Sequence, residues 1–254
     1  MRRIGLSVTA LVTASALAAC GSSSSGGTSS SPTGGSSPSS TAFDATAAQQ
    51  TAQSAVLTLN DLPAGWTSTP NQDSAADDAA LFGKLASCLQ VSPTIFAKSG
   101  PGKVEVSSPD FASPNNGATG GVSENVDVET PAGIAAEFAA VHSSKLTGCM
   151  QTVYTSFLRQ KFAQDPSTKG VTIGTVTAVR GHIPTYGDES DGVEITVPLS
   201  AGTTNTSEII DLIFIRVGNI SANISFQNTG GAFDTATAAS ITSKAAAKLT
   251  AAAG

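Results

Sequence analysis

Nucleophilic, acid–base and metal chemistry need particular side chains close together, and this sequence offers few of them. It contains three cysteines and only two histidines, His142 and His182, which stand apart from each other and from the cysteines. None of the motifs G-x-S-x-G, H-E-x-x-H or a glycine-rich phosphate loop occurs. The sequence therefore favours a protein that is not an enzyme and has neither cofactor nor metal. A hydrolase that assembles its serine and histidine from distant positions is the remaining enzymatic alternative.

One segment, residues 186–194, is rich in carboxylates: Asp188, Glu189, Asp191 and Glu194. Calcium needs an oxygen-rich loop, but this spacing does not fit an EF-hand loop. An Asp-Gly pair at 191–192 is typical of a turn before a strand. We therefore expect a solvated hairpin turn here rather than a metal site.

The first cysteine follows an export signal. Residues 1–19 begin with two arginines and continue with an apolar run over 4–16, too short to span a bilayer as a mature helix. The end of this segment, Leu17-Ala18-Ala19-Cys20, resembles the bacterial lipobox, in which the signal is cut before a cysteine that carries acyl chains such as palmitate. The resemblance implies a lipidated Cys20 and a protein anchored on the outer face of the cell membrane. A plain secretory signal is the alternative.

The other two cysteines then remain as a pair in an exported chain, where thiols tend to be oxidised. We predict a disulfide between Cys88 and Cys149. Closing a loop of about 60 residues in this way restrains the unfolded chain by roughly 4 kcal/mol on the chain-entropy model. A metal site would need clustered cysteines and histidines instead.

Charge disfavours one class of partner, and composition separates a tether from a folded domain. Without residues 1–19 the chain has 11 Lys and Arg against 19 Asp and Glu, a formal charge of −8, which disfavours nucleic acid as a partner. Residues 21–41 are all Gly, Ser, Thr or Pro, and such a segment buries too little apolar surface to fold. We therefore predict a lipidated tether over 20–53 and a single domain over 54–254.

Hydrophobic periodicity predicts an α+β domain. Strands are expected over 54–59, 103–108, 121–130, 171–181, 191–200, 208–218 and 219–228. Residues 212–217 are apolar at nearly every position and predict a central strand covered on both faces, with a tight turn at 217–219 before the last strand.

Four helical segments complete the expected domain. The first covers 75–89 and places Cys88 on the apolar face with Leu85 and Leu89. The second covers 133–146 after a Thr130 cap and Pro131, and a third follows Gly148 and carries Cys149. The last begins after Asp234. A mainly antiparallel sheet flanked by helices, an α/β/α sandwich, is the predicted fold, and the disulfide would join two helices.

The sequence LTLNDLPAGW, residues 57–66, ends in the single tryptophan. Pro63 presets the backbone for a turn that brings Leu62 and Trp66 towards each other. The indole then either closes one end of the sheet or lines a cleft there. Because burying an indole removes a large area from water, we favour packing and keep Trp66 as a weak ligand-binding candidate.

The sequence combines the lipobox, the Ser/Gly tether, LTLNDLPAGW, one cysteine on each of two helices, GDES and the late IRVGN turn. Together these features resemble actinobacterial envelope lipoproteins of the LpqN and PknH-sensor-like kind. The resemblance implies a PsbP/Mog1-like fold, and a non-enzymatic module that binds a small molecule, a lipid or glycolipid, or an envelope protein. We expect an apolar or amphipathic ligand in a cleft between sheet and helices. A sensor or scaffold module without a small ligand is the alternative.

Overall fold

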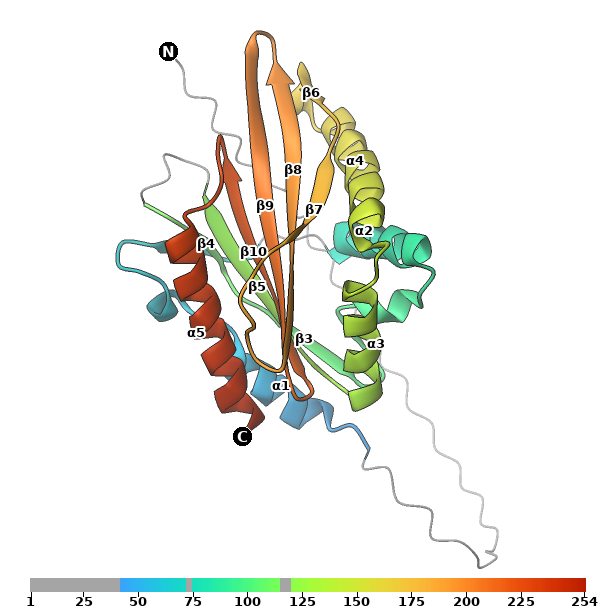
Figure 1. Ribbon diagram of the computed structural model, residues 1–254, viewed down its shortest axis with the longest axis vertical. Helices are drawn as coiled ribbons and strands as arrows, with labels where there is room; N and C mark the ends of the chain where they lie inside the picture. Colours follow the sequence, from blue (N-terminus) through green and yellow to red (C-terminus); the bar gives the residue numbers. More distant parts are fainter. Residues whose placement is uncertain (1–41, 72–74, 115–119) are drawn as a thin grey trace, which may run out of the picture.

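Helices pack on both faces of one antiparallel sheet in the computed structural model, which describes residues 42–71, 75–114 and 120–254. Figure 1 shows α1 and α5 along one face of the sheet, and α2, α3 and α4 along the other. The α+β sandwich is therefore confirmed.

The helices are α1 (Ala45–Ala55), α2 (Ala75–Leu89), α3 (Pro131–Val141), α4 (Leu146–Gln164) and α5 (Thr235–Ala253), with 3-10 turns η1 (Leu59–Asp61), η2 (Pro93–Phe96) and η3 (Pro166–Thr168). The strands are β1 (Thr67–Thr69), β2 (Ser99–Gly100), β3 (Lys103–Ser107), β4 (Asp110–Ala112), β5 (Gly121–Glu129), β6 (Val171–Ile173), β7 (Thr177–Gly181), β8 (Glu189–Ala201), β9 (Thr204–Val217) and β10 (Ile220–Thr229).

The chain enters the fold through a helix rather than a strand. Helix α1 occupies residues expected to be tether, and the strand predicted over 54–59 is wrong. Alanine, the best helix former, recurs in α1, and the Asp44 carboxylate accepts hydrogen bonds from the first free N–H groups. Because Ala48 and Ala52 are buried, tertiary packing holds a helix whose apolar face is made of small residues.

The sheet runs in the order β1-β4-β5-β10-β9-β8-β6, and every pairing between these strands is antiparallel. Strand β3 pairs with the same edge of β5 as β4 does, and β7 pairs with β8. In β9, Ile213 and Ile215 face α1 and α5, whereas Leu212 and Phe214 face the opposite helices. Strand β9 is thus the central strand, covered on both faces, that the sequence predicted.

The break between helices α3 and α4 lies earlier in the sequence than expected. Thr130 and Pro131 open α3 as predicted, but this helix ends at Val141, and Gly148 lies inside α4. The guanidinium of Arg180 explains this end, because its Nη2 donates hydrogen bonds to the carbonyl oxygens of Val141 and Ser143, at 2.6 and 2.8 Å. Val141 is the last residue of α3, where carbonyls have no further helical N–H to accept from, and the Ser143 carbonyl also accepts from the Leu146 N–H. A side chain from β7 therefore stabilises the break.

The last third of the chain folds nearly as predicted, except that one expected strand is split into two. The strand expected over 171–181 is split into β6 and β7 around Gly174, whose N–H donates to the carbonyl of Pro198. A tight turn at Gly218, with φ of 60°, joins β9 to β10 as predicted. Asp234 caps α5, which buries Ile241, Ala245 and Leu249 against the sheet as predicted.

Candidate functional site

Strands β5 and β10 present different chemistry to the two layers, because successive side chains of a strand point to opposite faces. Towards α1 and α5 they are apolar apart from the buried Glu124, as Val126 and Ile224 illustrate. Towards α2, α3 and α4 they are mainly polar: Ser123, Asn125, Asp127, Asn223, Ser225 and Gln227. The sheet therefore has a polar area beneath three helices.

A groove with a volume of about 310 Å³ lies over this polar area. Its opposite walls are apolar and come mainly from α2, η2 and α4: Leu81, Phe82, Leu85, Phe96, Met150, Tyr154 and Phe157. Leu212 and Phe214 of β9 continue the apolar lining. A polar floor with apolar walls suits an amphipathic molecule, because each part of such a ligand meets a matching surface.

The disulfide predicted between Cys88 and Cys149 is confirmed, and it joins α2 to α4 with a Cα–Cα distance of 5.7 Å. Cys149 is buried, whereas Cys88 is exposed at the edge of α2 and does not point inward as expected. Leu85 and Leu89 make the buried face of α2 instead. The bond therefore fixes the separation of two groove walls from their outer side.

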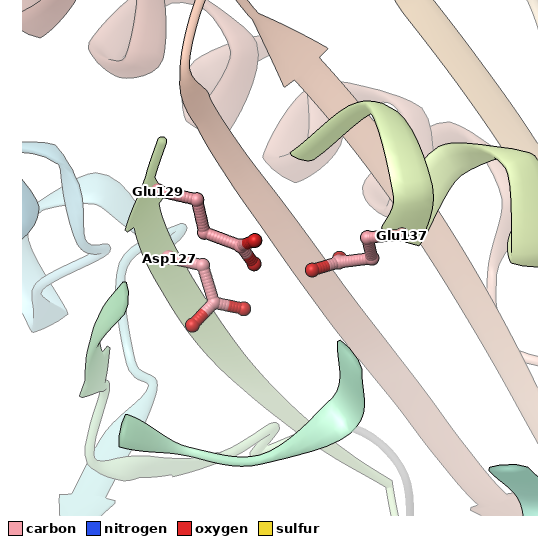
Figure 2. A group of neighbouring side chains, drawn as sticks. All are labelled: Asp127, Glu129 and Glu137. Atoms are coloured by element: carbon pink, nitrogen blue, oxygen red, sulfur yellow. The ribbon is translucent and has the colours of Figure 1, made fainter. Parts of the chain in front are cut away.

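Three carboxylates surround one lysine at the end of the groove nearest α3. Asp127 and Glu129 project from β5 and Glu137 from α3, and Figure 2 shows their carboxylates turned towards one another. The Nζ of Lys103, on β3, lies 3.2, 2.8 and 3.2 Å from oxygens of these three residues in turn. All four side chains are buried, so this cluster is an electrostatic feature of the interior.

The shifted pKa values show how the cluster carries its charge. Burial lowers the pKa of Lys103, but the attraction of Asp127, Glu137 and Glu129 outweighs it, so the net pKa is raised and the ammonium stays charged. Burial raises the pKa of Asp127 to about 7, against the opposing attraction of Lys103. Burial likewise raises the pKa of Glu137 well above its ordinary value. Near neutral pH the cluster therefore holds protons in addition to its lysine.

The same three carboxylates have the chemistry of a divalent-cation site, because one oxygen from each lies within 4.8 Å of the others. The Lys103 ammonium contacts all three, so it takes the place that a metal ion would take. A metal would have to displace a buried, charged lysine. We therefore treat the cluster as part of the groove and not as a metal centre.

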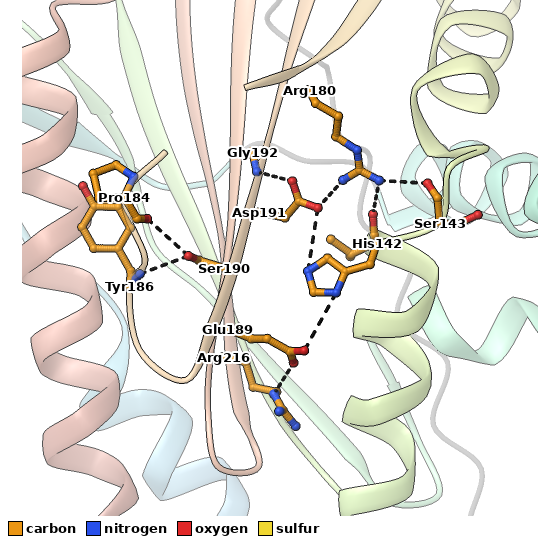
Figure 3. A network of polar contacts seen from close by, with 11 residues as sticks. His142, Ser143, Arg180, Pro184, Tyr186, Glu189, Ser190, Asp191, Gly192 and Arg216 are labelled. Carbon is orange, nitrogen blue, oxygen red and sulfur yellow. Dashed lines mark hydrogen bonds and ion pairs between the residues drawn. The ribbon is translucent and has the colours of Figure 1, made fainter. Parts of the chain in front are cut away.

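The acidic segment around residue 190 is not the solvated turn that we expected. Strand β8 begins at Glu189, and Asp191 and Gly192 lie within it. Glu189 pairs with Arg216 at 2.9 Å and Asp191 pairs with Arg180, as Figure 3 shows. Because these arginines come from β9 and β7, long-range ion pairs hold the segment in the sheet.

His142 lies between these two carboxylates, with its Nδ1 3.9 Å from Glu189 and its Nε2 3.8 Å from Asp191. Ser190 is adjacent in sequence but points to the other side of β8, where it donates to the carbonyl of Pro184 (Figure 3). In the described parts of the chain, no hydroxyl forms a hydrogen bond with His142 or His182. This geometry offers no activated serine, and the absence of an enzymatic activity stays a prediction.

The remaining sequence candidate within the described residues, Trp66, lies away from the groove. Trp66 is buried on the α1 and α5 side, with its ring centroid 6.2 Å from that of Phe233, and it does not line the groove. This position indicates that Trp66 has a packing role. Cys20 lies outside the described residues, so its lipidation stays a prediction.

A second hollow, of about 540 Å³, lies between the end of α4 and β6, with Arg159, Asp165 and Lys169 among its lining residues. It holds none of the buried carboxylates and borders the edge of the sheet. The groove beneath α2 and α4 is the better candidate, because it combines buried charge with apolar walls.

Lys103, Asp127, Glu129 and Glu137 are not among the residues that the sequence predicted as candidates. Asp127 and Glu129 alternate with Val126 and Val128, a pattern usually explained by a strand with one solvated face. The residue that could have indicated a buried charged cluster is Glu137, a carboxylate within the otherwise apolar residues 134–141. A helix with such a residue can cover a polar strand face only if the charges are paired.

Comparison with known proteins adds one weak likeness. No family model and no curated protein matches the chain. The crystal structure of the extracellular domain of PknH from Mycobacterium tuberculosis is similar at 8% identity and a TM-score of 0.36, over 80% of this chain and 96% of that one. This likeness carries no argument about function, so membership of the family suggested by the sequence motifs stays a prediction. In the described part of the chain, no helix has the length and apolar character needed to cross a membrane.

Proposed function

We propose that this chain is an extracytoplasmic lipoprotein, anchored by Cys20, that binds an amphipathic small molecule or lipid in the groove and does not transform it. The groove carries the proposal, because its apolar walls and polar floor lie between the sheet and three helices. The Cys88–Cys149 disulfide supports an oxidising compartment, where such bonds persist.

The alternative, a docking module without a small ligand, has less support. Among the described residues, the large apolar side chains that are exposed are Leu59 and Val179, at 40% and 53%, and they lie on different elements. A protein-docking surface usually presents a contiguous apolar patch of several hundred Å². The groove is therefore the stronger candidate for recognition.

Native mass spectrometry tests ligand binding. Residues 21–254, which contain the whole described fold, would be secreted by a host with a lipid-rich envelope, purified and weighed before and after extraction with organic solvent. We expect a stoichiometric extra mass that moves into the solvent. The variant Ser225→Phe, which fills the floor, should lose this mass, and Thr250→Phe on exposed α5 should keep it. A bare wild-type mass, or equal loads in both variants, would contradict the proposal.

The anchor has a separate test in the full chain. We expect the wild type in the membrane fraction, with an intact mass that begins at Cys20 and includes acyl chains. Each buried methylene contributes about 0.8 kcal/mol, so several chains hold the protein firmly. Cys20→Ser should abolish the added mass. If the wild type is unmodified, the membrane anchor is wrong and the groove proposal is unaffected.

A further inference from the structure

The groove carries an excess of negative side chains. Its charged lining residues are Lys103 against Glu105, Asp127 and Glu137. Glu105 has an ion pair with Lys98 at 3.7 Å, outside the lining, and Lys103 is shared by three carboxylates. Above the pKa of Asp127, which burial raises to about 7, that carboxylate is ionised, and an anionic head group entering the groove would meet more repulsion than attraction.

Two acceptor atoms in the lining have no hydrogen-bond partner in the described part of the chain. Oδ2 of Asp127 contacts Lys103, but Oδ1 has no hydrogen-bond partner among the described residues, although the residue is only 7% exposed. The Oδ1 of Asn223, on the neighbouring strand, is also without a partner there. Buried acceptors of this kind are costly unless a donor reaches them. Above its pKa of about 7 the Asp127 carboxylate is ionised and accepts hydrogen bonds only, and the Asn223 amide oxygen is an acceptor at any pH, so the missing group is a donor.

The walls suit a cation as well as an apolar chain. Five aromatic side chains line the groove: Phe82, Phe96, Tyr154, Phe157 and Phe214. Aromatic faces attract ammonium groups, and the contact between the Lys161 ammonium and the Phe157 ring, at 5.8 Å, is an example in this chain. Apolar, aromatic and acidic surfaces thus converge on one cavity.

We infer that the groove takes an amphipathic molecule whose head group is a hydrogen-bond-donating cation, such as a primary amine. The head group lies against Asp127 and Asn223, and the apolar part lies between α2 and α4. This inference rests on the proposed function and specifies the class of ligand for the same site.

The inference also sets a pH dependence. Asp127 faces Lys103 and Glu105 on β3, Glu129 on β5 and Glu137 on α3, and burial raises its pKa to about 7. An amine binds the ionised carboxylate, so binding requires loss of the proton. Amine affinity should therefore fall by up to about tenfold per pH unit below that pKa, while the affinity of a neutral ligand should not.

Titration with matched probes tests the head group. Decylamine, decanol and decanoate have equal chains with a cationic, neutral or anionic end, and ethylamine has the cation without the chain. Binding to residues 21–254 would be measured by calorimetry below the micelle concentrations. We expect decylamine to bind at least about tenfold more tightly than the other three, because charge-assisted hydrogen bonds are stronger than neutral ones. Equal or tighter binding of decanol or decanoate overturns the head-group inference but leaves the groove proposal intact.

Binding by ethylamine at the strength of decylamine would mean a site for free amines and would overturn the amphipathic part. If no probe binds, both the inference and the proposed function fail. Asp127→Asn should reduce decylamine affinity about tenfold and remove its pH dependence. Asp211→Asn, the same change on the opposite face of the sheet, should leave both as in the wild type. If Asp127→Asn does not fold, the wild-type pH dependence decides, and a flat profile overturns the inference.

Discussion

The backbone N–H of Leu57 donates a 2.6 Å hydrogen bond to Oε2 of Glu124, so the turn after α1 is held by a carboxylate at the centre of β5. Glu124 is only 1% exposed, and its Oε1 has no partner among the described residues. Burial raises the pKa of Glu124 to about 8, against the opposing effect of the Leu57 hydrogen bond. The interior therefore favours the protonated acid.

Stability should consequently fall as the pH rises. The pKa of Glu124 in the folded state is above its ordinary value of 4.5, so the folded state binds more protons between about 4.5 and 8. Stability is fully present below this window and is lost through it, at up to about 1.4 kcal/mol per pH unit. Urea unfolding at pH 5, 6, 7 and 8 measures the slope. A stability that rises over this range would contradict the shift.

Glu124→Gln should flatten that slope. The amide keeps an oxygen for the Leu57 N–H but cannot ionise, so the variant should gain stability relative to the wild type as the pH approaches 8. Asp188→Asn is a matched control at an exposed site, where the carboxylate accepts from the Gly218 N–H. The control should retain the wild-type slope, and a common slope in all three proteins would refute the assignment to Glu124.

Lys103→Met should be among the most damaging single changes. Removing the cation leaves three buried carboxylates without compensation, which costs about 3–5 kcal/mol. The loss should be larger at pH 8 than at pH 5, because the carboxylates are then ionised. Lys248→Met breaks the pair with Asp61, which is 2.8 Å long but more exposed, and should cost about 1 kcal/mol or less. Equal losses for the two variants would show that Lys103 is not the central cation.

The Cys88→Ala/Cys149→Ala double variant should lose about 2–4 kcal/mol of unfolding free energy. Chemical denaturation of the oxidised wild type, the reduced wild type and the variant checks this, since reduction should reproduce the loss. Intact mass should show the oxidised chain two hydrogens lighter than the reduced one. Cys20→Ala is the control that should change neither stability nor the disulfide.

Trp66 should report on the core and not on the groove. Phe233 packs between Trp66 and Phe226, with ring centroids 6.2 and 5.2 Å away. Phe233→Ala should cost about 3–5 kcal/mol and shift the Trp66 emission to longer wavelength. Val179→Ala, at an exposed position, should change stability by no more than about 0.5 kcal/mol. A groove probe that shifts the emission of wild-type Trp66 would place its ligand on the other face.

Local signals predicted much of this fold. The alternation in β10 and the caps at Thr130 and Asp234 are patterns among neighbouring residues, so they could be recognised without knowing the distant partners of these elements. Helix α1 was missed because its buried face consists of alanines, which give no hydrophobic periodicity. Its helical state depends on contacts with the sheet and α5.

The site was harder to predict than the fold. Lys103 and Glu137 lie 34 residues apart and meet only because β3 and α3 pack at the same part of β5. A polar residue in a strand needs a hydrogen-bonding partner, which is either water or another side chain. Whether a helix covers that residue decides between the two, and the helix comes from a distant part of the sequence.

Strands β5 and β10 pair in the middle of the sheet although they lie far apart in the sequence: Val128 faces Ile220 and Gly121 faces Gln227. Such non-local pairings close long loops and slow folding. The floor of the groove therefore forms only after nearly the whole chain is available. A nascent or partly threaded chain that ends before Ile220 lacks this pairing and has no completed pocket, so recognition begins only with the finished polypeptide.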